Sequence, residues 1–198
     1  PQLGGILGAI VQLASKIGSI LDIFGTAEAS GSSSSGTPGS ISGGPVNYQE
    51  AAKKIVECAL AYEKSKIQYG QVNPPSPPKD GGQCDCSGMA QNCYKAAGIE
   101  IPRTADIQCA FFKKHNATFT GDMHQLKAGD LVFTSDSNHE IDHVFVYIGD
   151  GKAVNLGGRN GKGSNGGDAR LYNGWDVIKA GIEWHKGPPT FGSLEKLC

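Results

Sequence analysis

Hydrophobic residues recur every three or four positions over the first 24 residues of the chain, while polar residues fall on another side. This spacing is typical of an amphipathic helix, which we expect over residues 1–25. Polar positions within it, including Lys16 and Asp22, make insertion into a bilayer costly. We therefore favour a helix that docks on the chain's own folded domain or on a second copy over one that contacts a membrane through residues 2–24.

The next stretch, residues 26–45, contains the run ASGSSSSGTPGSISGG and has too little apolar surface to offset the entropy of ordering it. Its composition predicts a flexible linker. We accordingly place a single folded domain over residues 46–198.

Three helices are expected in the first half of this domain. Asn47 opens a capping-box pattern, and apolar residues spaced as on one helix face follow it over residues 47–66. A second helix is expected over residues 86–97, with Gly98 as its C-terminal cap, and a third over residues 104–113.

In the second half of the domain, the spacing of hydrophobic residues changes to that typical of strands. Short β-branched and aromatic runs bounded by Gly and Asp predict strands at residues 129–134, 143–149, 152–156 and 177–185. The glycine-rich residues 157–168 are expected to form a loop. Helices followed by a small antiparallel sheet give an α+β fold class.

The charge and the composition of the chain limit the partners and the cellular location that we expect. The chain has a formal net charge of −1, and its acidic and basic residues are interspersed, so nucleic acid is not an expected partner. Its six cysteines, together with a start at Pro1 that resembles a processed end, favour a secreted, extracellular protein.

Cys86 is the most informative of these cysteines. If Asp85 caps the second helix, the Cys86 thiol lies in the first turn, where free backbone N–H groups and the helix dipole favour a thiolate. The pKa of such a thiol falls from its ordinary value into the range of about 3.5 to 7.5, which makes it a nucleophile. The sequence alone leaves half of a disulfide as an equal alternative. A metal site is disfavoured, because the spacing from Cys84 to Cys86 is too short for a zinc knuckle.

A nucleophilic cysteine needs a base, and His143 is the candidate because it starts a predicted strand that would hold it rigidly. His115, His124, His139 and His185 lie in polar segments or at a strand end. The loop 149–151 predicts a hairpin that pairs Ile148 with Lys152 and Phe145 with Asn155. His143 and Asn155 then become diagonal neighbours on one face, where the amide oxygen can orient the imidazole.

Three segments in this order, DCSGMAQNCYKAAGIEIPRTADIQ, LKAGDLVF and DHVFVYIGDGKAVN, resemble the NlpC/p60 cell-wall cysteine peptidases of the papain-like superfamily. The resemblance covers about residues 47–172. It implies a papain-like fold with N-terminal helices on a small antiparallel sheet. The catalytic residues that it implies are Cys86, His143 and Asn155. By the same resemblance Tyr69 lines the reaction site, and the substrate peptide is faced by Asp85, Ser87 and Arg103.

The resemblance implies a secreted endopeptidase that hydrolyses peptidoglycan stem peptides at the bond from γ-D-glutamate to the following diamino acid, without a metal or organic cofactor. One alternative is an acyltransferase on the same scaffold, which the order of Cys86 before His143 disfavours. Another is a membrane- or partner-active protein that works through its N-terminal helix and has a degenerate Cys/His site. A further hypothesis is that the same helix covers the groove and keeps the enzyme latent.

With Cys86 assigned to catalysis, an odd number of cysteines remains, so full pairing is impossible. We expect up to two disulfides whose partners the sequence does not assign. The candidates are Cys58, Cys84, Cys93, Cys109 and Cys198. Cys198 is the favoured anchor for the C-terminal tail, and the alternative for Cys93 is a plain buried residue.

Overall fold

A computed structural model describes residues 46–136, 138–157, 169–173 and 188–198 of the chain. All of these residues belong to one compact unit. The helix expected over residues 1–25, the linker, the strand expected over residues 177–185 and all but one residue of the loop expected at 157–168 lie outside the described residues. The domain boundary therefore stays a prediction.

The three predicted helices are confirmed. They are α2 (Tyr48–Lys64), α3 (Cys86–Ala96) and α4 (Ala105–Lys114). The Asn47 side chain caps α2 by accepting the backbone N–H of Glu50. Gly98 follows α3 with φ at 81°, the left-handed conformation that favours glycine after a helix. Thr104 occupies the N-cap position of α4, but its side chain makes no capping hydrogen bond.

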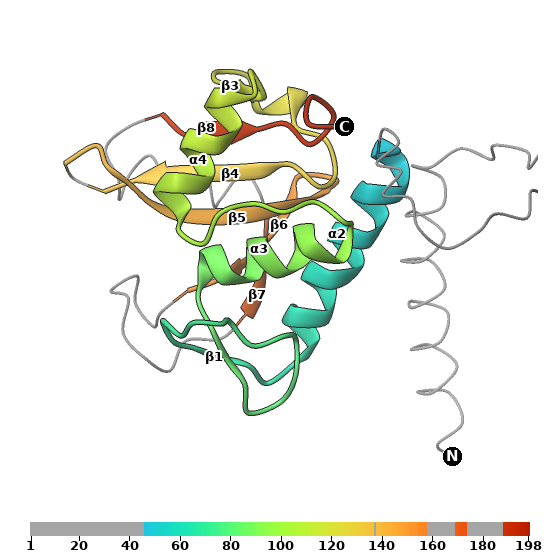
Figure 1. Cartoon of the computed structure of the whole chain (residues 1–198), viewed down its shortest axis with the longest axis vertical. Coiled ribbons are helices and arrows are strands. Elements are labelled where there is room, and N and C mark those ends of the chain that lie inside the picture. Colours follow the sequence, from blue (N-terminus) through green and yellow to red (C-terminus); the bar gives the residue numbers. More distant parts are fainter. Residues whose placement is uncertain (1–45, 137, 158–168, 174–187) are drawn as a thin grey trace, which may run out of the picture. The chain divides into compact units, whose positions relative to one another are not determined.

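Within the described residues the main sheet has six strands, and every neighbouring pair is antiparallel. The order across the sheet is β3-β8-β4-β5-β6-β7 (Figure 1). In chain order the strands are β3 (Thr118–Phe119), β4 (Leu131–Ser135), β5 (Ile141–Gly149), β6 (Lys152–Leu156), β7 (Ala169–Asn173) and β8 (Thr190–Gly192). Strands β4, β5 and β6 were predicted at nearly these bounds, whereas β3, β7 and β8 were not predicted. The α+β class is confirmed.

The β5–β6 hairpin has the expected register in its body but not at its turn. Val146 pairs with Val154 and Tyr147 with Ala153, which is the register predicted for Phe145 opposite Asn155. Lys152, however, pairs with Gly149 instead of Ile148, because the register shifts by one residue next to the turn. Gly149, Asp150 and Gly151 all have positive φ, so the turn has three left-handed residues.

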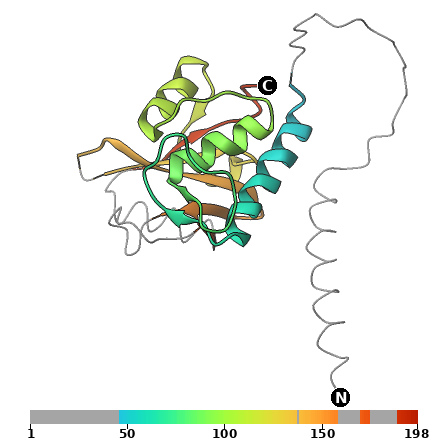
Figure 2. The ribbon, with the colours of Figure 1, turned by 60° about the horizontal axis from the view of Figure 1, so that its bottom comes forward.

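Aromatic contacts join the helices to the sheet. The Phe112 ring of α4 lies 5.9 Å from both the Tyr94 ring of α3 and the Phe133 ring of β4, edge to face in each case. Gly192 of β8 packs against this group so closely that a Cβ atom there would lie 2.8 Å from Phe112. The helices α2 and α3 lie side by side in both views of the ribbon (Figure 1, Figure 2), and α2, α3 and α4 all contact β5.

A second, two-stranded sheet places Tyr69 beside the start of α3. Its strands, β1 (Gln68–Tyr69) and β2 (Gln83–Cys84), are parallel, and Tyr69 pairs with Cys84. The loop between them folds back on itself, since the backbone N–H of Ser76 donates to the carbonyl of Gln83 at 2.9 Å. These strands are two residues long, which is too short for a hydrophobic period to predict.

All six cysteines are free thiols, so the expected disulfides are absent from the structure. Cys93 is fully buried, in agreement with the alternative that it is a buried residue without a disulfide partner. Cys109 lies on α4 and Cys198 at the C-terminus, and each carries an unbridged thiol. Among the described residues, none of the helices is both long and apolar enough to span a bilayer.

Candidate active site

The site is built around the first turn of α3, where Asp85 caps the helix as predicted. The Asp85 Oδ1 atom accepts the backbone N–H of Gly88 at 2.7 Å. Gly88 is required at that position, because a Cβ atom would lie 2.6 Å from the Cβ of Pro75 and 2.9 Å from Asp85 Oδ1. The cap thus fixes the backbone at Cys86, which is the first residue of the helix.

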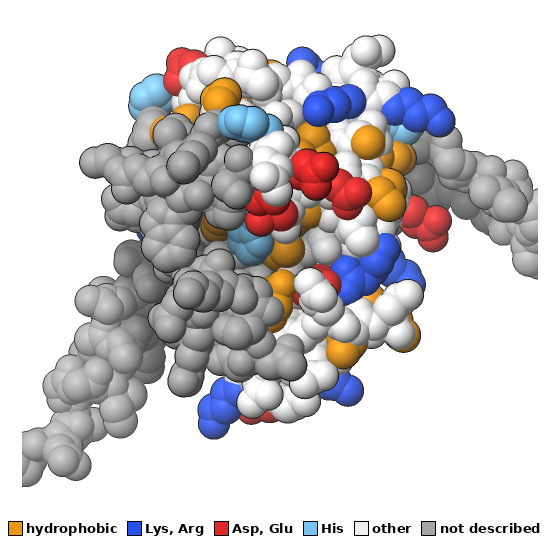
Figure 3. Space-filling view, turned by 90° about the vertical axis from the view of Figure 1, so that its left-hand side faces the viewer, with side chains coloured by type: hydrophobic (Ala, Val, Ile, Leu, Met, Phe, Trp, Pro, Cys, Tyr) orange, Lys and Arg blue, Asp and Glu red, His pale blue; other side chains and the backbone are white. Residues whose placement is uncertain are grey.

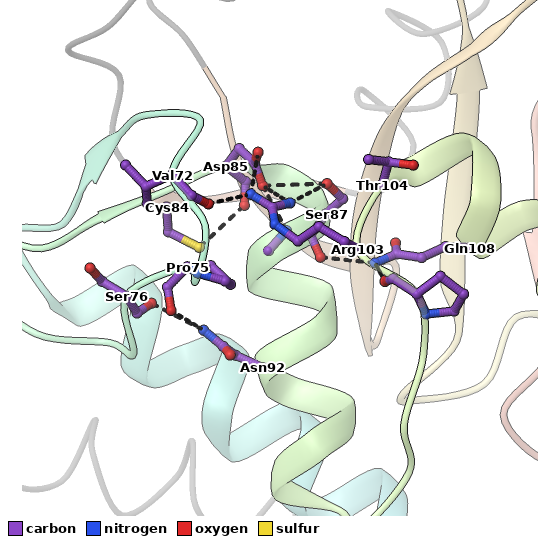
Figure 4. Close-up of polar contacts among 12 residues, drawn as sticks. Val72, Pro75, Ser76, Cys84, Asp85, Ser87, Asn92, Arg103, Thr104 and Gln108 are labelled. Atoms are coloured by element: carbon purple, nitrogen blue, oxygen red, sulfur yellow. Dashed lines mark hydrogen bonds and ion pairs between the residues drawn. The ribbon is translucent and has the colours of Figure 1, made fainter.

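Arg103 holds this cap in place from the connection before α4. Its guanidinium group makes two parallel hydrogen bonds of 2.8 Å with the two carboxylate oxygens of Asp85 (Figure 4). It also donates to the Ser87 hydroxyl at 3.1 Å and to the carbonyl of Val72 at 2.7 Å. Paired N–H···O bonds of this kind are geometrically specific. Arg103 therefore joins the start of α3 to the loop after β1.

The Cys86 sulfur lies between α3 and β5. Its side chain is buried, and the sulfur accepts backbone hydrogen bonds from Ser87 and Val144. Because Val144 follows His143 directly, the sulfur lies next to the part of β5 that carries the predicted base.

The electrostatics of Cys86 differ from our prediction of a thiolate. Burial, followed by the nearby Asp85 carboxylate, raises the pKa of the Cys86 thiol to about 12. Removing the sulfur from water destabilises the thiolate by more than the two backbone N–H groups stabilise it. The ground state at neutral pH is therefore a neutral thiol.

His143 and Asn155 meet as the hairpin register predicted. His143 Nε2 and Asn155 Oδ1 are 2.7 Å apart. Because an amide oxygen only accepts, Nε2 carries the proton and Nδ1 remains a base. The imidazole lies edge-on to Phe145, with 4.7 Å between ring centres. Burial lowers the pKa of His143 below its ordinary value, although the bond to Asn155 opposes this shift.

A β-bulge brings Asp142 into the site, which sequence reasoning missed. Thr134 pairs with His143, but Ser135 pairs with Ile141, so Asp142 is an extra residue on β5. A bulge breaks the alternation of side chains along a strand. Asp142 consequently lines the same groove as Cys86, and its charge raises the pKa of His143. Strict alternation along β5 would place the Asp142 side chain on the face opposite to that of His143.

A groove with a volume of about 380 Å³ runs past these residues. It is lined by five of the residues predicted for the site: Tyr69, Asp85, Cys86, Ser87 and Arg103. His143 and Asn155 do not line it. Figure 3 looks onto this end of the molecule, where acidic, basic and histidine side chains gather. In the part of the chain that the structure describes, no three acidic, histidine or cysteine side chains are grouped so as to hold a metal ion.

The groove wall next to Tyr69 comes from the loop after β1, through Gln71 and Val72. Gln71 hydrogen bonds to the Tyr69 phenol. Burial raises the pKa of Tyr69 above its ordinary value, so the phenol keeps its proton at neutral pH. A protonated phenol at the groove is a hydrogen-bond donor.

The pKa directions predict the pH dependence of any reaction at Cys86. The base form of His143 is required, so kcat/KM should rise as the pH increases through the pKa of His143, below about 6.5, and then stay level. The thiol pKa of about 12 leaves no alkaline fall near neutrality. Initial rates at constant ionic strength measure this profile. An alkaline limb between about pH 7.5 and 9 would instead indicate a preformed thiolate–imidazolium pair.

The sequence matches known proteins over the part of the chain that contains this site. The model of the NlpC/P60 family matches residues 66–165, just over half of the chain. The bifunctional muramidase/DL-endopeptidase CwlT of Bacillus subtilis is 34% identical over 114 residues, which are 57% of this chain and 30% of that protein. A γ-D-glutamyl-L-lysine dipeptidyl-peptidase of the same organism is 31% identical over 113 residues, which are 56% of this chain and 34% of that protein. The chain thus spans about a third of these relatives' length.

The fold is also that of a solved relative. NlpC1 from Trichomonas vaginalis superposes with a TM-score of 0.52 at 17% identity, over 72% of this chain and 44% of that one. The match of the family model, together with this agreement in fold, identifies the protein as a member of the NlpC/P60 family.

Proposed function

We propose that this protein is a cysteine endopeptidase that hydrolyses peptidoglycan stem peptides, at the bond from γ-D-glutamate to the following diamino acid. The observation that carries the proposal is the hydrogen bond of 2.7 Å from His143 to Asn155, on the strand whose Val144 contacts the Cys86 sulfur. A nucleophile, a base and a group that orients the base are the minimum set for covalent catalysis of acyl transfer.

In the proposed mechanism, the neutral Cys86 thiol gives its proton to Nδ1 of His143 as the sulfur attacks the peptide carbonyl. The resulting oxyanion is stabilised by the backbone N–H of Cys86, in the first turn of α3, and by the Tyr69 hydroxyl. The imidazolium then protonates the leaving amine. A water molecule, activated by the same imidazole, hydrolyses the thioester and restores the thiol.

The substrate peptide is proposed to lie in the groove against Asp85 and Ser87. Arg103 is already engaged by Asp85, Ser87 and Val72, so its main effect would be to fix their positions. We further propose that the protein acts outside the cell, where peptidoglycan is found.

Tyr69→Phe tests the assigned oxyanion donor. The variant keeps the ring in the groove but removes the hydroxyl, and loss of one such donor typically lowers the rate by about 100- to 1000-fold. We expect kcat to fall in this range with little change in KM, because the donor acts in the transition state. A loss of less than about threefold would remove Tyr69 from the mechanism.

Mass spectrometry of the fragments released from purified peptidoglycan tests the proposal as a whole. The full chain should release fragments that end in γ-D-glutamate and leave a new free amine on the diamino acid. The matched control is Cys86→Ala, which should release none. Cleavage of a glycosidic or D,D-peptide bond, or equal release by the control, would refute the proposed reaction.

Transfer to an added amine separates hydrolysis from the acyltransferase alternative. The same digestion is repeated with a labelled primary amine in excess. Peptidase activity predicts free carboxylates as the main product, whereas labelled amides as the main product would favour the acyltransferase.

A further inference from the structure

Gln108 of α4 is a buried polar residue behind the groove. Its side chain is fully buried and does not line the groove itself. The side-chain nitrogen donates to two backbone carbonyls, those of Ser87 at 2.9 Å and of Pro102 at 2.8 Å (Figure 4). Because a carbonyl oxygen only accepts, these two bonds fix which end of the amide is the nitrogen. The mechanism proposed above does not use this residue.

The two carbonyls belong to two segments that form the wall of the groove. Ser87 lies in the first turn of α3, directly after Cys86, and Pro102 directly precedes Arg103. Ser87 and Arg103 both line the groove, and the Arg103 guanidinium group donates to the Ser87 hydroxyl at 3.1 Å. One buried amide therefore holds the backbone on both sides of a contact between two side chains that line the groove.

The amide oxygen of Gln108 indicates that this side chain does more than fill space. Within the described residues, this buried oxygen has no hydrogen-bond partner. An unpaired buried acceptor is destabilising, and an apolar side chain of similar volume would avoid it. What a glutamine adds at this position is therefore its pair of donated hydrogen bonds.

A second glutamine, Gln91 of α3, makes a similar bond outside the groove. Its side-chain nitrogen donates at 3.0 Å to the carbonyl of Ile101, the residue before Pro102. Gln91 and Ile101 line a separate pocket, and neither of them lines the groove. The connection from α3 to α4 is thus held by a glutamine from each helix. Of the two, Gln108 is the one whose amide also holds the carbonyl of Ser87.

We propose that Gln108 is a positioning residue that keeps the groove preformed for the substrate peptide. This inference rests on the proposed peptidase function, because it concerns how the stem peptide binds. With the two bonds of Gln108 in place, Ser87 and Arg103 are ordered before the peptide arrives. Without these bonds, binding must also order this part of the wall, and each side chain that has to be ordered weakens binding by about 2- to 10-fold.

Gln108→Met tests the proposal, because methionine has a similar volume but donates no hydrogen bond. For stem-peptide cleavage by the full chain, we expect KM to rise by about 3- to 20-fold. The Asp85 cap still holds the start of α3 and with it Cys86, so kcat should change by less than about threefold. The matched control is Gln91→Met, which removes the bond to Ile101 and should leave both constants unchanged.

Hydrogen exchange gives a second readout, which does not depend on activity. The backbone N–H groups of Gly88 and Met89 are bonded to Asp85 and report on the first turn of α3. In Gln108→Met they should exchange about tenfold faster than in the unaltered protein, as expected for the loss of about one net hydrogen bond. Such an opening stays rare, so it is compatible with an unchanged kcat. Gln91→Met should leave the exchange of both groups unchanged.

The two readouts separate failure of this inference from failure of the proposed function. If the unaltered protein cleaves no stem peptide, the proposed function is wrong, but the exchange of Gly88 and Met89 still tests the role of Gln108. An unchanged KM in Gln108→Met, an equal rise of KM in Gln91→Met, or unchanged exchange in Gln108→Met would each overturn the proposal.

Gln108→Asn provides a test that keeps an amide at this position. Asparagine is one methylene group shorter than glutamine, so its amide cannot reach both carbonyls. We expect KM to rise in this variant too, by a smaller factor than in Gln108→Met. If the methionine variant does not fold, an unchanged KM in Gln108→Asn would by itself overturn the proposal.

Discussion

Cys86→Ala is expected to lower kcat/KM for stem-peptide hydrolysis by about 10⁴-fold or more, since removing the nucleophile of a catalytic set leaves only binding and oxyanion stabilisation. Release of amino groups from purified peptidoglycan, followed with an amine-reactive reagent, measures the loss. The effect should be on kcat, because the sulfur forms a bond that exists only after the substrate is bound.

The Cys86 result needs a control for folding, because the sulfur accepts hydrogen bonds from Ser87 and Val144. Cys86→Ser keeps a hydrogen-bond acceptor of similar shape at this position. We expect this variant to unfold at nearly the temperature of the wild type and still to be inactive, because a serine hydroxyl is a poorer nucleophile beside an imidazole selected for a thiol. Activity within tenfold of wild type in Cys86→Ala would exclude Cys86 as the nucleophile.

His143→Gln is expected to lower kcat by about 10²- to 10⁴-fold, which is the usual contribution of a general acid–base group. Glutamine retains a polar side chain near Asn155 but cannot carry a proton between sulfur, leaving group and water. The rise of kcat/KM with pH that we attribute to His143 should also disappear. A variant that keeps this pH dependence would show that another group is the base.

Asn155→Ala distinguishes orientation from proton transfer. The bond from Asn155 raises the pKa of His143, so its loss should move the acid limb of the pH profile to lower pH. The fall in kcat should be smaller than for His143→Gln, because water can replace the amide oxygen while the imidazole still transfers protons. An unchanged acid limb would mean that Asn155 has no effect on the base.

Sequence patterns predicted the elements on which the site is built, and the reasons are local. Helices α2 and α3 are specified by caps and by apolar spacing within a dozen or so residues, as at Asn47, Asp85 and Gly98. The β5–β6 hairpin is specified by its turn, which is why the contact of His143 with Asn155 followed from counting residues. The resemblance added the assignment of Cys86.

Features that depend on contacts between distant segments were not predictable in this way. The two-residue strands β1 and β2 exist because Gln68 and Tyr69 meet Gln83 and Cys84, not because of a pattern within either segment. The bulge at Asp142 arises from a change of register between β4 and β5, which neither strand's own sequence displays. Both features shape the groove.

The sequence by itself determined the helices α2, α3 and α4 and the strands β4, β5 and β6, and that a cysteine would stand at the start of a helix. Only the tertiary structure decided the charge state of that cysteine. The first turn of a helix favours a thiolate, but the packing of α3 against β5 removes the sulfur from water, and this desolvation raises the pKa of Cys86. The local sequence pattern specifies a helix or a strand, whereas the burial of a side chain depends on which distant segments of the chain pack against it.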